Sequence, residues 1–522
     1  MLQPQRLCAI LWLLIQAVAA IDVDWDDPTS IKSAAGTVAY GMMSYYKGNE
    51  SGQTPGLLPQ PYYWWEAGAM FGSLIDYWLY TGDATYNDVV TEGLQFQVGP
   101  HNDFMPPNQT FDMGNDDQAF WAMSALTAAE NNFPNPPEGE PSWLSLAQAV
   151  FNEQIGRWDT STCGGGLRWQ VFQANTGYDL KNSISNGALI NIAARLARFT
   201  NDDLYAQWAE KIWDWMETIG LIDQNYNVYD NSEADRLNCT QLDRNQWCYN
   251  AGTMLMGAAT MFNYTEGDPV WYNRTNGLMR AIAFDYFPAN DGGVMKDICE
   301  EYNACNTDQK SFKAYLARWM AASTQLAPFT YETFLDLLQV SAKAAAAQCN
   351  GNGPIAPAGQ TCGLKWYLNG TWDGTDGVGQ QMAALEVILG TLIAKTAVPL
   401  TNTTGGTSTS NPSAGFNSSS VPPAQIVTPP SKGEKAGAWI LTAIVLVLAT
   451  WTAWFMWSRA WEPREEVART SSNEKGKEKA PVEKGASVGV LTRAREDEER
   501  AVPKALSRPL RRLRFQDVAA AR

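Results

Sequence analysis

The stretch Tyr80–Asp88 reads YTGDATYND, and it has counterparts at Phe199–Trp208 (FTNDDLYAQW), Tyr264–Asn273 (YTEGDPVWYN) and Leu326–Phe334 (LAPFTYETF). Each stretch separates two segments whose apolar residues recur with helical spacing. In the first three, an Asp follows an aromatic residue or Thr and can cap the next helix. This repetition predicts a chain that is built from pairs of helices.

The apolar spacing predicts twelve helices, whereas strand-like alternation is scarce. The connections before the even-numbered helices are longer and richer in Gly, Asn and aromatic residues. Six hairpins with long loops at one end predict an all-α fold, an (α/α)6 toroid whose even helices form an inner ring. The long loops would then meet at one mouth, where sites usually lie. The predicted helices span residues 30–46, 62–81, 84–98, 116–131, 142–158, 185–200, 202–221, 250–264, 268–287, 308–326, 330–349 and 376–396.

Segments at both ends of the chain differ in composition from this helical region. Residues 1–20 have one Arg, a short apolar core and a small-residue end, the layout of a secretory signal peptide. Residues 21–400 form the predicted folded unit. Residues 401–436 are rich in Ser, Thr, Pro and Gly, and we expect an extended, O-glycosylated stalk there.

An uncharged apolar run at residues 437–457 is long enough to cross a bilayer as a helix. The tail after it, residues 458–522, has 16 Lys/Arg and 11 Asp/Glu, a net charge of +5, and we expect it to be disordered. The preceding 457 residues have 22 Lys/Arg and 44 Asp/Glu, a net charge of −22. Because basic flanks face the cytoplasm, we expect a type I protein of the secretory pathway, with the acidic domain outside the plasma membrane.

Possible glycosylation and disulfide sites agree with an extracellular domain. All the Asn-x-Ser/Thr sites precede the apolar run: Asn49, Asn108, Asn238, Asn263, Asn273, Asn369, Asn402 and Asn417. Pairing cysteines by proximity in the sequence gives Cys239–Cys248, Cys299–Cys305 and Cys349–Cys362, with Cys163 left over, although spacing does not fix connectivity.

The residues at the start of each even helix would surround the mouth of the toroid. They are rich in carboxylates, amides and flat aromatic rings, a combination that binds sugars. The candidates for substrate binding are Trp64, Trp65, Glu66, Asn115, Asn186, Tyr249, Asn250 and Asp376. Any single Asp or Asn at a helix start is more often a cap than a ligand.

The doubled acid Asp116-Asp117 is harder to explain as a cap, because one acid is enough and the second repels the first. Two carboxylates that lie close together raise one pKa. The pair could then supply both a carboxylate and a carboxylic acid near neutral pH, as glycosidic cleavage requires. From these residues alone, capping and catalysis are equally good interpretations.

Other chemistries have little support in the sequence. His101 is the only histidine, which excludes a histidine-rich metal site, and no nucleophile motif accompanies it. The run CGGG at Cys163–Gly166 lacks the Lys-Ser/Thr of a phosphate-binding loop. Whether the LRWQ run at Leu167–Gln170 lines the mouth stays open. We expect no metal, no cofactor and no nucleic-acid partner.

Five segments together resemble glycoside hydrolase family 76, and within it the fungal cell-wall mannan endo-1,6-α-mannosidases. The resemblance covers residues 21–400, and the adjacent acids are its most specific motif. The segments are WWEAGAMFGSLIDYWLYTGD, GNDDQAFWAMSALTAAE, SISNGALINIAARLARFT, WCYNAGTMLMGAAT and DGVGQQMAALEVI.

The resemblance implies a retaining mechanism with Asp116 as nucleophile and Asp117 as acid/base. It also implies α-1,6-mannan or the mannose of a glycolipid anchor as substrate, and wall glucan as an acceptor in transglycosylation. Fungal members resemble glycolipid-anchored proteins with an apolar C-terminus, whereas 65 polar residues follow the apolar run here. The alternative function is a mannan-binding receptor or wall sensor without activity, and the intact acidic pair favours the enzyme.

Overall fold

The computed structural model describes residues 21–415 and 432–459. The predicted signal peptide, residues 416–431 with Asn417, and the tail from residue 460 lie outside the described residues. Residues up to Ser431 and residues from Lys432 belong to two separate units. The first unit contains the helical domain.

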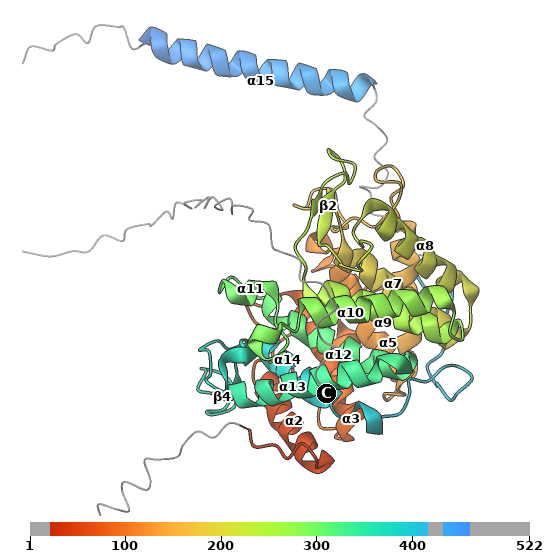
Figure 1. Ribbon diagram of the computed structural model, residues 1–522. Coiled ribbons are helices and arrows are strands. Elements are labelled where there is room, and N and C mark those ends of the chain that lie inside the picture. The colour runs from red at the N-terminus through yellow and green to blue at the C-terminus, as the bar shows by residue number, and fades with distance from the viewer. Residues whose placement is uncertain (1–20, 416–431, 460–522) are drawn as a thin grey trace, which may run out of the picture. The chain divides into compact units, whose positions relative to one another are not determined.

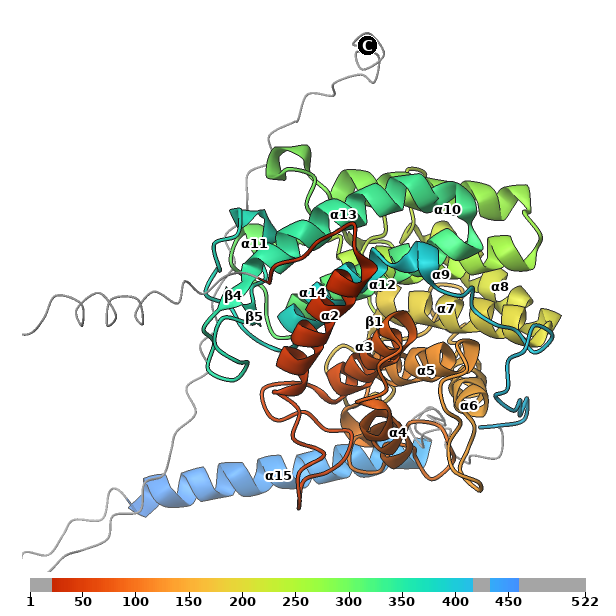
Figure 2. The ribbon, with the colours of Figure 1, turned by 90° about the horizontal axis from the view of Figure 1, so that it is seen from below.

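Six helices form a closed inner ring, because each contacts the next along the chain and the last contacts the first. In Figure 2 these helices lie side by side, with α4, α6, α10 and α13 toward the outside, while α2 overlaps α14 in this view. The inner helices are α3 (Trp64–Thr81), α5 (Asn115–Glu130), α7 (Ser183–Thr200), α9 (Cys248–Tyr264), α12 (Phe312–Leu326) and α14 (Val378–Gly390).

Six outer helices cover the ring, and most of them pack between two inner ones; α6, for example, contacts both α5 and α7. They are α2 (Pro28–Met43), α4 (Asn87–Phe96), α6 (Trp143–Gly156), α8 (Asp203–Ile219), α10 (Pro269–Asp285) and α13 (Tyr331–Gln348). The predicted all-α class and all twelve helices are confirmed. The largest boundary errors are at α12, which a 3-10 turn precedes, and at α14, which ends at Gly390.

Two of the three predicted Asp caps are present. Asp202 accepts the N–H of Leu204, and Asp268 accepts the N–H of Val270. Asp83 instead accepts the Thr85 N–H and the Tyr77 hydroxyl, and α4 begins only at Asn87. Here the Asp shapes the turn rather than the helix end.

Short elements occupy the connections. Antiparallel β1 (Leu180–Asn182), β2 (Asn231–Glu233) and β3 (Leu242–Asp243) form one small sheet, and β4 (Cys349–Gly351) pairs with β5 (Thr361–Cys362). The remaining short helices are α11 (Ile298–Glu301), η1 (Thr110–Asp112), η2 (Ala289–Asp291), η3 (Gln309–Ser311), η4 (Pro328–Thr330), η5 (Trp366–Leu368) and η6 (Ile393–Lys395).

Buried ion pairs join the inner helices in their middle and C-terminal parts. Arg318 of α12 contacts Asp76 of α3 at 2.8 Å and Glu386 of α14 at 2.6 Å. Arg195 of α7 contacts Glu130 of α5 at 2.7 Å. These five residues are all at least nine-tenths buried, and we call them the basal ion-pair network. Removing one partner would leave an uncompensated buried charge, which costs about 3–5 kcal/mol.

The disulfide pairs correct one prediction. Cys299–Cys305 and Cys349–Cys362 are present as predicted, but Cys239 pairs with Cys163, 76 residues away. The predicted Cys239–Cys248 pair is therefore wrong. Cys248 is a buried free thiol at the start of α9, where its N–H donates to Asp297. Proximity along the chain failed because a helix start fixes Cys248 in the core while two long loops meet elsewhere.

The start of the predicted stalk is also corrected, because residues 401–415 pack on the domain. The Ser408 hydroxyl accepts the Leu144 N–H, and Asn152 donates to the carbonyl oxygens of Pro412 and Ala414. A polar sequence can be held in this way when its hydrogen bonds are satisfied by the folded domain. The folded unit extends to at least residue 415.

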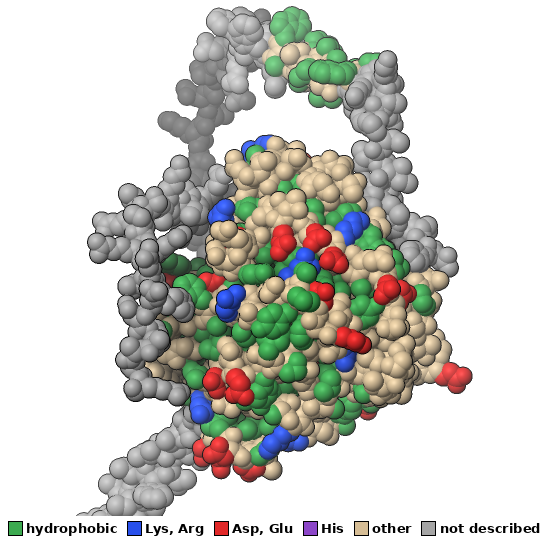
Figure 3. Space-filling view, turned by 45° about the vertical axis from the view of Figure 1, so that its right-hand side comes forward, with side chains coloured by type: hydrophobic (Ala, Val, Ile, Leu, Met, Phe, Trp, Pro, Cys, Tyr) green, Lys and Arg blue, Asp and Glu red, His purple; other side chains and the backbone are tan. Residues whose placement is uncertain are grey.

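The positions of the predicted glycosylation sites in the structure are compatible with glycosylation. Seven of the eight predicted sites, all except Asn417, lie at exposed positions. On the face shown in Figure 3, acidic and basic side chains are interspersed with hydrophobic ones. Glycosylation itself stays a prediction.

The second unit contains one described helix, α15 (Lys432–Arg459). Its described side chains are those of residues 439, 440 and 442–454. Among the described residues, no helix has an apolar stretch long enough to cross a membrane.

Candidate active site

A cavity of about 160 Å³ lies where the N-terminal ends of five inner helices meet. Its lining mixes four carboxylates with aromatic rings. The lining residues are Trp65, Asp116, Asp117, Phe120, Trp169, Leu180, Asn182, Asp230, Asn231, Tyr249, Asp308 and Phe312. The predicted mouth therefore exists, although the start of α14 does not line this cavity.

The acidic pair occupies the first turn of α5, where backbone N–H groups are free to donate. Asp117 accepts the N–H of Gly114 at 2.7 Å, and Asp116 accepts the N–H of Asp117 at 3.1 Å. A Cβ on Gly114 would lie 2.2 Å from one Asp116 oxygen, so the glycine leaves room for the carboxylates. Asp117 therefore acts as the helix cap, and Asp116 is not needed for that purpose.

The LRWQ run, whose placement the sequence left open, forms one wall of the cavity. Asn115 N–H donates to the Trp169 carbonyl at 2.8 Å, and Val171 N–H donates to the Met113 carbonyl at 3.1 Å. The Trp169 indole hydrogen-bonds to Asp116. This backbone pairing holds the indole against the acidic pair.

Both acids of the pair are harder to ionise than ordinary aspartates. Burial and the neighbouring Asp117 charge raise the pKa of Asp116 well above its usual value. Burial raises the pKa of Asp117 to about 7, opposed by the Gly114 N–H and supported by the charge of Asp308. Near neutral pH the pair therefore holds at least one proton.

Two further carboxylates line the cavity, Asp308 and Asp230. Asp308 begins a predicted even helix and is expected at the mouth, but neither residue is among the predicted substrate-binding candidates. Burial raises the pKa of Asp308 to about 6, and one oxygen of its buried carboxylate has no hydrogen-bond partner among the described residues. Asp230 accepts from Asn250 at 3.2 Å and from Asn231 at 3.0 Å. Asp308 stands near a predicted helix start, so the sequence carried a signal for it. Asp230 lies in a loop between α8 and α9, where no helical pattern marks it.

Two predicted substrate-binding residues, Trp65 and Tyr249, line the cavity. The Tyr249 ring stacks on Phe312 with centroids 3.7 Å apart, and the Trp65 ring lies 4.6 Å from Phe120. These contacts fix flat surfaces at the cavity wall.

Three predicted amides support the site from behind and do not line this cavity. The Asn115 side chain donates to the Arg168 carbonyl, and Asn186 exchanges two hydrogen bonds with the Leu167 backbone. Asn250 is fully buried and donates to Asp230. All three position residues of the wall or of the cavity.

Three other predicted site residues also lie outside the cavity lining. Trp64 stacks on Trp121 and its indole N–H donates to Gln97. Glu66 is fully buried and accepts the N–H of Tyr63 at the start of α3. Asp376 accepts the hydroxyl of Tyr45. Each of these polar groups holds a helix start or an aromatic side chain in place. This is an ordinary structural role for residues at the start of a helix.

The described residues contain no group of three or more His, Cys, Asp or Glu side chains that could hold a metal ion. His101 is exposed and lines a separate cavity with Asn411, Ser413, Ala414 and Gly415.

The segment of the chain that forms this site matches the sequence model of a known protein family. Residues 30–403 match the model of glycosyl hydrolase family 76. The chain belongs to this family. The family 76 domain thus includes every residue that lines the cavity.

Two similar proteins come from a fungus. The chain is 46% identical over 430 residues to mannan endo-1,6-alpha-mannosidase DCW1 of Saccharomyces cerevisiae, covering 82% of this chain and 93% of that protein. It is 40% identical over 452 residues to mannan endo-1,6-alpha-mannosidase DFG5 of the same organism, covering 86% and 97%.

Solved family 76 structures share the fold. The crystal structure of Dfg5 from Chaetomium thermophilum in complex with glucosamine is 46% identical, with a TM-score of 0.72 over 76% of this chain and 98% of that one. An α-1,6-mannanase of Salegentibacter, an inactive variant in complex with α-1,6-mannotetrose, is 18% identical, with a TM-score of 0.55 over 71% and 99%. The helical ring is therefore common to distant relatives.

Proposed function

We propose that this family 76 enzyme is an endo-acting α-1,6-mannosidase of the fungal cell wall that cleaves with retention. The observation that carries the proposal is the Asp116-Asp117 pair, which lines an acidic, aromatic cavity and holds at least one proton near neutral pH. The curated relatives with 40–46% identity are named for this activity. In the Salegentibacter enzyme, the inactive variant has two adjacent aspartates replaced.

Asp116 is the proposed nucleophile. Its carboxylate accepts the Asp117 N–H and the Trp169 indole N–H, both of which favour the ionised form. The opposing charge of Asp117 disappears when Asp117 carries the proton. With one proton on Asp117, Asp116 is then free to attack the anomeric carbon.

Asp117 is the proposed acid/base. A pKa of about 7 lets it protonate the leaving oxygen and afterwards activate the water or sugar hydroxyl that resolves the intermediate. Retaining glycosidases keep their two carboxyl groups about 5–5.5 Å apart, and neighbouring residues of one helical turn reach such a separation more easily than the 6.5–9.5 Å of inverting enzymes.

A more specific proposal concerns the donor and the acceptor of the reaction in the cell. The four carboxylates of the cavity suit a donor with a cationic amino sugar, such as a glycolipid anchor, and the Chaetomium relative was crystallised with glucosamine. Attack by a sugar hydroxyl of wall glucan in place of water would link an anchored mannoprotein to the wall. Both outcomes use the same covalent intermediate.

We also propose that the enzyme acts at the outer face of the plasma membrane. The support is the signal-like start, the eight extracellular-type glycosylation sites and the uncharged run at residues 437–457, followed by the basic tail. The proposed order is folded domain, stalk, membrane span and cytoplasmic tail. A protease added to intact cells should cut the stalk and spare the tail, and cleavage of the tail would contradict this orientation.

Product analysis on an α-1,6-mannan oligosaccharide tests the activity. The wild-type protein should release shorter mannose oligosaccharides from internal positions, with the α-configuration in the first product formed. Asp116→Asn should reduce turnover by at least about 10³-fold, as expected for loss of a covalent nucleophile. Unchanged turnover in a folded Asp116→Asn protein would contradict the assignment of the nucleophile, and the absence of turnover in the wild type would favour the receptor function.

A further inference from the structure

We propose a second carbohydrate site, for a neutral hexose oligosaccharide, in a cavity of about 510 Å³ beside the catalytic pocket. This inference rests on the proposed function, because it assumes that the enzyme handles glycan chains. The residues that define the cavity for this argument are Trp158, Asp159, Thr160, Arg168, Gln173 and Tyr178.

The two cavities share one wall. The segment Met113–Asn115 pairs with Trp169–Val171, and side chains alternate across this extended segment. Trp169 lines the catalytic cavity, whereas its neighbours Arg168 and Gln170 line the second one. A chain bound in the second cavity would therefore lie one strand away from Asp116.

The charges of the second cavity cancel. Arg168 contacts Asp159 at 2.9 Å and Asp235 at 2.7 Å. Arg157 contacts Glu153 at 2.7 Å, and both of these side chains are buried. With its cations already paired, the cavity has no free charge to recruit a phosphate or an ammonium group. A neutral ligand suits it better than an ion.

The remaining lining matches the surface of a sugar. Thr160 and Gln173, a hydroxyl and an amide residue, line the cavity at exposed positions. The Arg168 guanidinium lies over the Tyr178 ring, 4.6 Å from its centroid, and packs against this ring in the wall of the cavity. Hydroxyl-binding polar groups beside fixed aromatic rings are what hexose units need.

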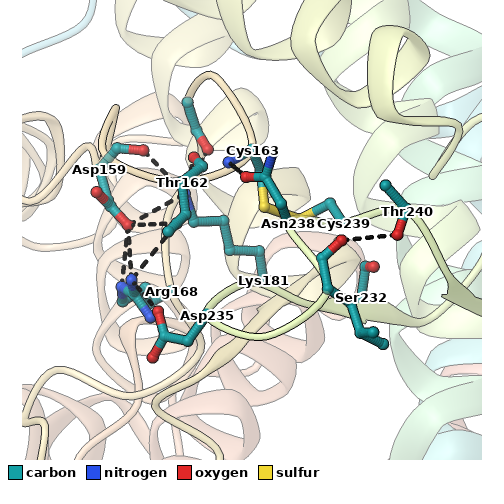
Figure 4. Close-up of a disulfide and its surroundings, with 12 residues drawn as sticks. Asp159, Thr162, Cys163, Arg168, Lys181, Ser232, Asp235, Asn238, Cys239 and Thr240 are labelled. Atoms are coloured by element: carbon teal, nitrogen blue, oxygen red, sulfur yellow. Dashed lines mark hydrogen bonds and ion pairs between the residues drawn. A yellow bond between two sulfur atoms is a disulfide. The ribbon is translucent and has the colours of Figure 1, made fainter.

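A disulfide, hydrogen bonds and ion pairs connect the walls of the cavity (Figure 4). The Cys163–Cys239 disulfide joins the loop that carries Asp159 to the loop that carries Asp235. Lys181 is fully buried and donates to the carbonyl oxygens of Asp159, Thr162 and Gly165. A preformed cavity loses little ordering entropy when it binds a ligand.

Two glycans have the required chemistry. One is a remote part of the donor mannan chain, and the other is the chain that accepts the transferred sugar. Both are neutral hexose polymers, so the site is defined by that shared chemistry. An α-1,6-mannan hexasaccharide and a glucan hexasaccharide distinguish the two sources.

The test measures binding with the Asp116→Asn/Asp117→Asn protein, so that turnover does not interfere. Adding Tyr178→Ala and Gln173→Ala should weaken the affinity for at least one hexasaccharide by about tenfold or more in calorimetric titrations. Tyr178→Phe keeps the ring and should retain the affinity. The matched control is Tyr40→Ala with Gln339→Ala, two exposed residues on α2 and α13 that are absent from both cavities.

A selective loss of the mannan ligand would assign the cavity to the donor, and a selective loss of the glucan ligand would assign it to the acceptor. Parent-like affinity of the folded Tyr178→Ala/Gln173→Ala protein for both ligands, or no binding of either by the parent, would overturn the proposal. Turnover of mannan by the wild type is scored separately. A wild type that cleaves mannan while the cavity variants bind normally would therefore retain the proposed function and refute only this site.

Discussion

The carboxylate of Asp117 turns back to accept the backbone N–H of Gly114, three residues earlier, at 2.7 Å. This single contact closes the N-terminus of α5 and keeps one acid of the pair beside the other. One acid thus serves as cap and as proposed proton donor, while the other faces the cavity without a capping task. The two interpretations of the doubled acid are therefore not exclusive.

Replacing Asp117 should affect substrates according to their leaving group. In Asp117→Asn, a mannan oligosaccharide should be cleaved at least about 10²-fold more slowly, because its sugar leaving group needs a proton. An aryl mannoside with a good leaving group should still form the glycosyl-enzyme, which mass spectrometry would detect. Equal losses for both substrates would contradict the assignment of Asp117 as acid.

The pH dependence of activity should have an alkaline limb near pH 7. Burial raises the pKa of Asp117 to about 7, so the proton needed for cleavage is present below that pH and lost above it. The kcat/KM for mannan oligosaccharides should fall about tenfold per pH unit beyond the limb. In Asp117→Asn the residual activity should lack this limb, and a limb that persists there would belong to another group.

Gly114→Ala should damage the site more than the fold. The new Cβ would lie 2.2 Å from an Asp116 oxygen and 3.1 Å from an Asp117 oxygen, while the backbone at Gly114, with φ −84°, suits any residue. We expect turnover to fall by about 10²-fold, as for a small displacement of reacting groups, with little change in the melting temperature. Gly390→Ala is the control, since its Cβ would meet only ordinary contacts of 3.4 Å or more; equal activity of the two variants would contradict the prediction.

The disulfide assignment can be checked by peptide mapping without reduction. A peptide that contains Cys163 should be linked to one that contains Cys239, and Cys248 should react with alkylating reagent only after unfolding. Replacing Cys163 and Cys239 by Ser should lower the free energy of unfolding by about 2–5 kcal/mol. A link between Cys239 and Cys248 would contradict the structure.

Glu66 should make the domain less stable as the pH rises. Burial raises its pKa from 4.5 to about 8, so the folded state holds the proton more tightly than the unfolded state. The free energy of unfolding should then decrease between about pH 4.5 and pH 8. Glu66→Gln cannot ionise and still offers an oxygen to the Tyr63 N–H. In urea titrations its stability relative to wild type should increase from pH 5 to pH 8.5, and a constant difference would contradict the prediction.

The helical ring could be predicted from the sequence because its signals are local. Apolar spacing and caps such as Asp202 and Asp268 depend on a few neighbouring residues. The pairing of Cys163 with Cys239 depends on where two loops meet, which no local pattern records. The packing of residues 401–415 on α6 is equally non-local, because Ser/Thr-rich sequence carries no apolar periodicity.

The site was predictable only in part for the same reason. Helix starts located Asp116, Asp117, Trp65 and Tyr249, all of which line the cavity. The same rule also selected Asn186 and Asp376, whose polar groups are used for internal hydrogen bonds. The direction in which a side chain at a helix start points depends on the loop that faces it. Asp230 belongs to such a loop and accepts a hydrogen bond from Asn250.

The basal ion-pair network makes the ring of helices a cup and not a tube. Arg318 and Arg195 bridge the inner helices in their middle and C-terminal parts, and the Phe120, Tyr315 and Trp65 rings pack against one another nearer the mouth. A polysaccharide therefore cannot be threaded along the axis of the ring. It has to be laid across the opening and lifted away sideways, so a bond far from either chain end is as accessible as a terminal one.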